Sequence, residues 1–136
     1  MSNQLDLGNF TADKASIPVR YVVKHPVTQQ PTDVVVLLVG LDSDLAQSCL
    51  DAQQVQSFQK LDLTREGVTA GFDPGENRAN LIELLAACTV GWENMMFDGE
   101  ELSFSKENAK MLYEKVPFIR DQVNRATGNR KLFFEV

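Results

Sequence analysis

Two short stretches near the start of the chain carry the hydrophobic pattern of β-strands. Between Ile17 and Lys24, apolar and polar residues largely alternate, which predicts a strand buried on one face. Every residue from Val34 to Val39 is apolar, which predicts a strand buried on both faces. The connection from His25 to Asp33 holds two prolines and is too short for a helical crossover. We therefore expect the two strands to pair as an antiparallel hairpin.

Helical periodicity dominates the remainder of the chain. Apolar residues spaced three and four apart predict four helices, over residues 44–61, 77–90, 105–116 and 117–128. Ser43 or Asp42 can cap the first of these helices, and Ser105 can cap the third. The first helix has an inner stripe of Leu45, Ala46, Cys49, Ala52 and Phe58. The glycine-rich stretch from Leu63 to Gly75 is expected to be a loop.

The dipeptide Asp98-Gly99 lies between two runs that bear apolar residues. Both central residues of a type I′ turn have positive φ, and Asp-Gly is a preferred pair there. A minor hairpin is expected at this point. Together with the first hairpin and the four helices, it predicts an α+β fold. We expect one domain over residues 17–128, a loosely ordered N-terminus over 1–16 and a C-terminal tail over 129–136.

The charge of the chain limits the partners that we expect. With 13 basic and 19 acidic residues, the net charge is −6, which disfavours nonspecific binding to nucleic acid or to an anionic membrane. The first residues, MSNQLDLGNFTADK, do not have the pattern of a signal peptide. Cys49 and Cys88 both lie in apolar helical patterns and are interpreted as free thiols. These features together predict a cytoplasmic protein.

The residue types that catalysis or metal binding requires are sparse. The single histidine, His25, precedes a proline in the predicted loop and has no nucleophile motif beside it. The chain has only three Cys and His residues in total, and they are too widely separated to form a zinc motif. Asp42 and Asp44 form a candidate acid–base pair, but they are better explained as residues at a helix start. We expect neither an enzyme nor a bound cofactor or metal.

Two apolar clusters remain as candidate binding sites. Met95, Met96 and Phe97 precede the minor hairpin, and alternation on a strand would expose one face of this cluster. Methionine suits adaptable surfaces. Phe133 and Phe134 near the last residue are either a docked strand or an exposed apolar tail. These five residues are predicted to bind partners or to contribute to self-association.

The order of several short motifs resembles the tail assembly chaperones of long-tailed (siphovirus) bacteriophages and prophages. The motifs of the second half are Gly91-Trp92-Glu93, Asp98-Gly99-Glu100, Phe104-Ser105-Lys106-Glu107-Asn108, Leu112, Pro117 and Gln122. Those of the first half are His25-Pro26, Thr28, Pro31 and Gly40-Leu41-Asp42-Ser43. The resemblance extends from about Val19 to Phe133. It departs at His25, where the family has an acidic residue, and near Gln30, where the family has a glycine.

This resemblance implies a binding protein that acts in the host cytoplasm. Such chaperones bind the long tape measure protein and promote polymerisation of the tail tube protein around it. Members of the family commonly also make a longer form by ribosomal frameshifting, and that form would be a further partner. The alternatives are a structural phage tail or connector subunit and a bacterial regulatory binding module.

Overall fold

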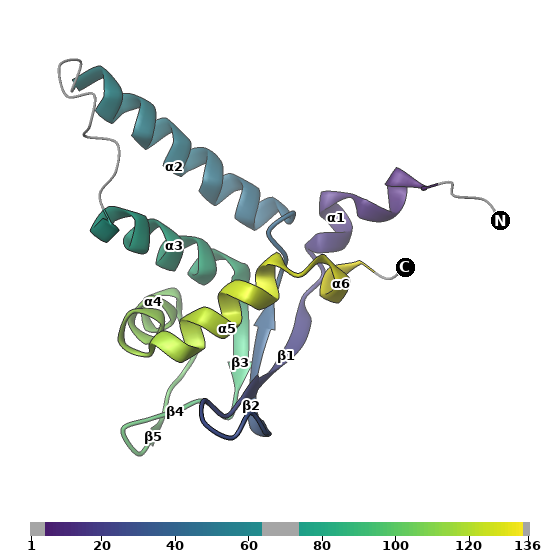
Figure 1. The fold of residues 1–136 in the computed structure, drawn as a ribbon, viewed down its shortest axis with the longest axis vertical. Coiled ribbons are helices and arrows are strands. Elements are labelled where there is room, and N and C mark those ends of the chain that lie inside the picture. The colour runs from purple at the N-terminus through teal and green to yellow at the C-terminus, as the bar shows by residue number, and fades with distance from the viewer. Residues whose placement is uncertain (1–4, 64–73, 135–136) are drawn as a thin grey trace.

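A computed structural model describes the backbone of residues 5–63 and 74–134, and the side chains of residues 5–54 and 77–134. The fold is α+β, as predicted (Figure 1). Its elements in chain order are η1 (Leu7–Phe10), α1 (Ala12–Ala15), β1 (Val19–Lys24), β2 (Pro31–Leu38), α2 (Asp44–Leu63), α3 (Pro74–Cys88), β3 (Thr89–Glu93), β4 (Met96–Phe97), β5 (Glu100–Glu101), α4 (Lys106–Lys115), α5 (Pro117–Gly128) and α6 (Arg130–Phe133).

The larger sheet has three antiparallel strands in the order β1-β2-β3. The predicted hairpin of β1 and β2 is confirmed, although β2 begins at Pro31 and the connecting loop is shorter than expected. The strand β2 lies in the centre. Val36 pairs with Tyr21 of β1 on one side and with Trp92 of β3 on the other. Adjacent side chains of a strand point to opposite faces, and both Val35 (7% exposed) and Val36 (0%) are buried, so β2 is covered on both faces at this point, in keeping with its unbroken apolar run.

The third strand is a correction to the sequence analysis, which extended a helix to Val90. The helix α3 ends at Cys88, and Thr89 begins β3. The Thr89 hydroxyl donates to the Leu85 carbonyl (2.7 Å), and the Val39 N–H donates to the Cys88 carbonyl (2.8 Å). Pairing with β2 therefore overrides the local helical pattern, because the ladder satisfies backbone groups that would otherwise be buried without partners.

The minor hairpin forms where Asp98-Gly99 predicted it. Asp98 has a φ of 53° and Gly99 a φ of 83°, and β4 and β5 pair on either side of them. Trp92 holds in place the segment that follows β5, at Leu102 and Phe104. Its ring packs edge-on against Phe104 (5.0 Å between centroids), and its indole N–H donates to the Leu102 carbonyl (2.7 Å).

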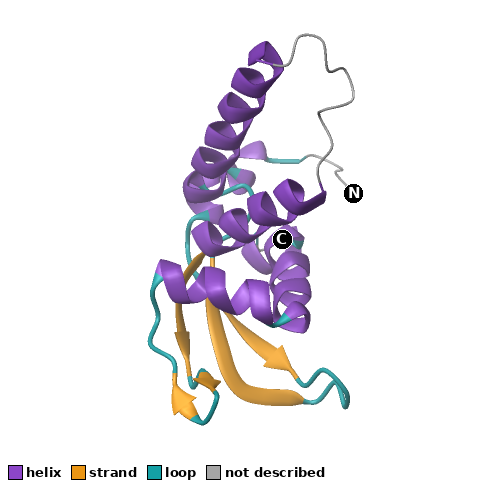
Figure 2. Cartoon of the chain, turned by 90° about the vertical axis from the view of Figure 1, so that its left-hand side faces the viewer, coloured by secondary structure: helices purple, strands orange, loops and turns teal. Residues whose placement is uncertain are grey.

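The main core lies between the larger sheet and three helices, α3, α4 and α5 (Figures 1 and 2). Apolar side chains of β1 and β2 meet those of the helices, and the buried members of this core include Val36, Leu38, Leu85, Leu112, Tyr113, Ile119 and Val123. The helix α4 is capped by Ser105, whose hydroxyl accepts from the Asn108 N–H (3.0 Å), as predicted. The helix α5 begins at Pro117 and ends at Gly128, also as predicted.

The helix α2 projects beside α3, away from the sheet (Figure 1). Ser43, and not Asp42, caps it: the Ser43 hydroxyl accepts from the Ala46 N–H (3.2 Å). Of the predicted inner stripe, Ala46 is buried, whereas Leu45 is 46% exposed. The side chain of Phe58 and most of the expected loop, residues 64–73, lie outside the described residues, and Pro74 begins α3.

Candidate functional site

The N-terminal segment contains two short helices and is attached to the loop between β2 and α2. Ala15 is fully buried, and its carbonyl accepts from the Gly40 N–H (3.0 Å). The Ser16 hydroxyl donates to the Ala12 carbonyl (2.8 Å) and accepts from the Asp44 N–H (3.1 Å). These bonds anchor the end of α1 to the residue that begins α2.

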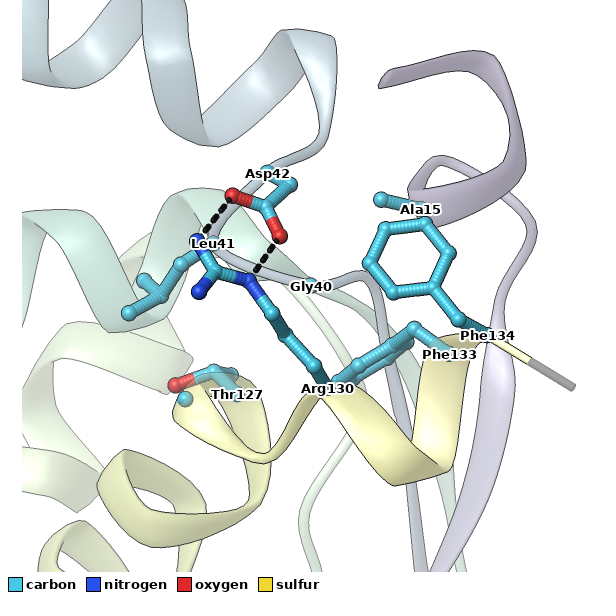
Figure 3. A pocket seen from close by; sticks show the side chains of 9 residues that line it. Ala15, Gly40, Leu41, Asp42, Thr127, Arg130, Phe133 and Phe134 are labelled. Atoms are coloured by element: carbon cyan, nitrogen blue, oxygen red, sulfur yellow. Dashed lines mark hydrogen bonds and ion pairs between the residues drawn. The ribbon is translucent and has the colours of Figure 1, made fainter. Parts of the chain in front are cut away.

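The C-terminal segment is attached to the same loop from the other side (Figure 3). Asn129 lies between α5 and α6, and its side chain caps α6 by accepting from the Lys131 N–H (3.1 Å). The Arg130 guanidinium donates two hydrogen bonds to the Asp42 carboxylate, at 2.7 and 3.0 Å. This hydrogen bonding lowers the pKa of Asp42.

Two phenylalanines complete this attachment. The ring of Phe133 lies on Gly40 so closely that a β-carbon at residue 40 would be 3.0 Å from the ring. Phe134 is only 4% exposed, and its ring meets that of Phe10 edge-on at 5.3 Å between centroids. We call the surface formed by residues 5–17, the loop 40–42 and residues 130–134 the α1–α6 junction.

The α1–α6 junction is hollowed in three places. A pocket of about 220 Å³ lies beneath the C-terminal segment and is lined in part by Ala15, Leu41 and Thr127 (Figure 3). Two more open grooves flank the Phe10–Phe134 contact. One is lined by Leu5 and Leu7, and the other by Ile17, Val19 and Leu132.

Exposed apolar side chains are concentrated around these grooves. Leu7 is 72% exposed, Leu5 67%, Ile17 63% and Leu132 38%. Large apolar side chains that gather on one surface are typical of a protein-binding site. Residues 5, 7 and 17 were not among the predicted site residues. The available signal was the isolated apolar residues within the polar N-terminal segment.

The five predicted site residues fall in two separate places. Met95 is buried at 4% exposure, Met96 is 58% exposed, and Phe97 is partly buried against the core. Phe133 is also partly buried, and Phe134 is buried, at the α1–α6 junction. Figure 1 places the β4–β5 hairpin well away from α6. Among the five side chains, Met96 alone is largely exposed.

The other candidate groups have local structural roles. The His25 ring Nδ1 accepts from the N–H groups of Val27 (3.1 Å) and Thr28 (3.3 Å), so it shapes its own loop. Burial raises the pKa of the Cys88 thiol to about 12, and Cys49 is partly buried. Within the described ranges, no three His, Cys, Asp or Glu side chains gather closely enough to bind a metal ion. No helix in those ranges is both long enough and apolar enough to cross a bilayer.

Comparisons of the chain with protein-family models, with curated proteins and with solved structures found no match.

Proposed function

We propose that this chain is a tail assembly chaperone of a long-tailed phage or prophage, which binds apolar segments of the tape measure protein in the host cytoplasm. The link to this family rests on the motif order between Val19 and Phe133. The observation that carries the binding role is the group of exposed apolar side chains at the α1–α6 junction, on a chain of net charge −6.

The chemistry of this surface suits such a role. Leucine and isoleucine side chains beside open grooves can pack against the apolar face of an amphipathic helix, which is a common mode of peptide recognition. The acidic charge of the chain favours solubility of the complex. Met96 on the minor hairpin provides a second exposed contact point. We propose that the tail tube protein and a frameshift-extended form of the chain are further partners.

Co-purification from cells that also express the tape measure protein tests this proposal. We expect Ile17→Glu and Leu132→Glu to abolish co-purification, because each places a charge in the proposed apolar contact. Met96→Glu tests the hairpin in the same way. Val27→Glu is the matched control, since Val27 is 81% exposed in the β1–β2 loop. If the Ile17→Glu and Leu132→Glu variants co-purify as well as Val27→Glu does, the α1–α6 junction is not the binding surface.

Mass spectrometry of purified virions distinguishes the chaperone from a structural tail or connector subunit. A chaperone is expected in infected-cell extracts and not in the finished particle. A chain that is present in virions at a fixed ratio to the tail tube protein would be a structural subunit. A tape measure gene directly downstream of the gene for this chain would favour either phage role, chaperone or structural subunit, over a bacterial regulatory module.

A further inference from the structure

Two exposed apolar features of the chain carry opposite charges and lie far apart. We propose that the β4–β5 hairpin of one copy binds the open groove beside Ile17 and Leu132 on a second copy, so that copies of the chain associate head to tail. The occupant of the groove is thus the hairpin of another copy. This self-association does not depend on the proposed function, because it involves no other protein.

The hairpin presents one apolar side chain among carboxylates. Met96 is 58% exposed, and its cross-strand partner Glu101 lies directly beside it on the same face. The next residue, Phe97, packs against the core, so Met96 points away from the body of the chain. Asp98 and Glu100 are also exposed, and within the described ranges neither they nor Glu101 form an ion pair. The hairpin is therefore an acidic projection with an adaptable apolar side chain on one face.

The groove has the opposite character. It has a volume of about 510 Å³, and its apolar lining includes Ile17, Val19 and Leu132. Lys14 is the only charged residue among the described residues that line it. Lys131 is exposed and precedes Leu132 in α6. Neither lysine forms an ion pair with another described residue, so both can bind carboxylates from outside the chain.

The hairpin and the groove of one chain lie too far apart to meet. Figure 1 places β4 and β5 well away from both α1 and α6. A contact between the two surfaces therefore joins different copies. Because the surfaces are unlike, the contact is heterologous, and it generates a closed ring or an open filament according to the rotation between neighbouring copies.

Charge complementarity favours this pairing over association through like surfaces. Two hairpins brought together would oppose carboxylates, and two grooves would oppose lysines, so both contacts are repulsive. A hairpin in a groove places carboxylates near lysines and covers Met96 with apolar side chains, which removes apolar surface from water. Because charges at the rim of a contact are screened by salt, association should weaken as the ionic strength rises.

Two variants that each disable one surface test the contact. Ile17→Glu places a carboxylate in the groove, and Met96→Glu places one on the hairpin, so neither variant should self-associate. A mixture contains an intact groove on the Met96→Glu chain and an intact hairpin on the Ile17→Glu chain. We expect sedimentation velocity at low ionic strength to show a one-to-one heterodimer, at least about tenfold tighter than the association of either variant with itself.

The unmodified chain and a matched variant are the controls. The unmodified chain is expected to form larger species as its concentration rises. Leu50→Glu should behave in the same way, because Leu50 is 37% exposed on α2 and belongs to neither surface. A mixture of Ile17→Glu and Met96→Glu that stays monomeric, while both are folded by circular dichroism, would overturn the proposal. So would a single variant that associates as tightly as the unmodified chain.

A charge swap on exposed residues provides a second test that leaves the apolar contact intact. The double variant Lys14→Glu/Lys131→Glu should self-associate at least about tenfold more weakly than the unmodified chain, because it opposes like charges. Adding Glu100→Lys and Glu101→Lys to the same chain reverses the hairpin as well and should restore the association. If the fourfold variant associates no more tightly than the double variant, the hairpin does not meet these lysines and the proposal is wrong.

Discussion

The side-chain amide of Gln122 binds both backbone groups of Lys24. Its Oε1 accepts from the Lys24 N–H at 3.0 Å, and its Nε2 donates to the Lys24 carbonyl at 2.8 Å. The same Oε1 accepts from the Tyr21 hydroxyl at 3.2 Å. Because β1 is an edge strand, Gln122 occupies backbone groups to which a further strand could bind. Through Gln122, the helix α5 thus covers the exposed edge of β1 at its Lys24 end.

Replacing Gln122 with leucine is expected to lower the free energy of unfolding by about 1 kcal/mol, the usual net value of such hydrogen bonds. Chemical denaturation at neutral pH measures the change. Asn124→Leu, on the exposed side of the same helix, is the control and should stay within about 0.5 kcal/mol of the unmodified protein. Equal effects of the two substitutions would show that the Lys24 contact contributes nothing specific.

A buried pair of hydroxyls links α4 to the start of β3. The oxygens of Thr89 and Tyr113 lie 2.6 Å apart, and Thr89 also donates to the Leu85 carbonyl. Thr89→Val removes the partner of the buried Tyr113 hydroxyl and should cost about 1–3 kcal/mol. Tyr113→Phe leaves Thr89 bonded to Leu85 and should cost less. Urea unfolding of both variants checks this order, and the reverse order would contradict it.

Stability should fall at alkaline pH. Burial raises the pKa of Cys88 from 9.0 to about 12 and that of Tyr113 from 10.0 to about 12. Both groups then hold their protons more tightly in the folded chain than in the unfolded chain. Their contribution to the free energy of unfolding is therefore fully present below pH 9 and is lost as the pH rises toward 12. We expect the urea midpoint to drop across this window. The drop should be smaller in a Cys88→Ala/Tyr113→Phe variant, and an equal drop would assign the pH dependence to other groups.

Two glycines near the α1–α6 junction should respond to alanine in opposite ways. A β-carbon on Gly40 would lie 3.0 Å from the Phe133 ring, whereas one on Gly128 would lie 3.7 Å from Leu41, an ordinary contact. Gly40→Ala should therefore cost about 1–3 kcal/mol through overpacking. Gly128→Ala, in the last turn of α5, should stabilise by up to about 1 kcal/mol. Thermal unfolding of the two variants measures both changes.

The adjacent methionines provide a test of the boundary between core and surface at the minor hairpin. Met95 is 4% exposed and Met96 58% exposed. Met95→Ala should cost about 2–5 kcal/mol because it leaves a cavity in the core. Met96→Ala should change stability by no more than about 0.5 kcal/mol. Comparable losses from the two substitutions, measured by urea unfolding, would mean that Met96 is also covered in solution.

Features that depend on neighbouring residues were predictable from the sequence. The turn at Asp98-Gly99, the cap at Ser105 and the start of α5 at Pro117 each follow from the conformational preference of one or two residues. The antiparallel pairing of β1 and β2 followed from the length of their connection. Each of these predictions rests on local chemistry alone.

Features that depend on distant residues were not predictable in this way. Thr89 and Val90 continue the helical pattern of α3 and become a strand only because β2 lies beside them. The burial of Phe134 depends on Phe10, at the other end of the chain. The α1–α6 junction was missed for the same reason, since no periodicity within residues 5–15 indicates what they contact.

The position of β3 in the sheet has a consequence for the folding kinetics. The strands β1 and β2 are joined by a short loop and can form their hairpin early, whereas β3 reaches β2 only after α2, α3 and the segment between them. Closing that long loop costs conformational entropy before any β2–β3 bond is gained. Docking of β3 is therefore expected to limit the rate at which the sheet is completed. Until then, the central strand keeps one apolar edge open to solvent.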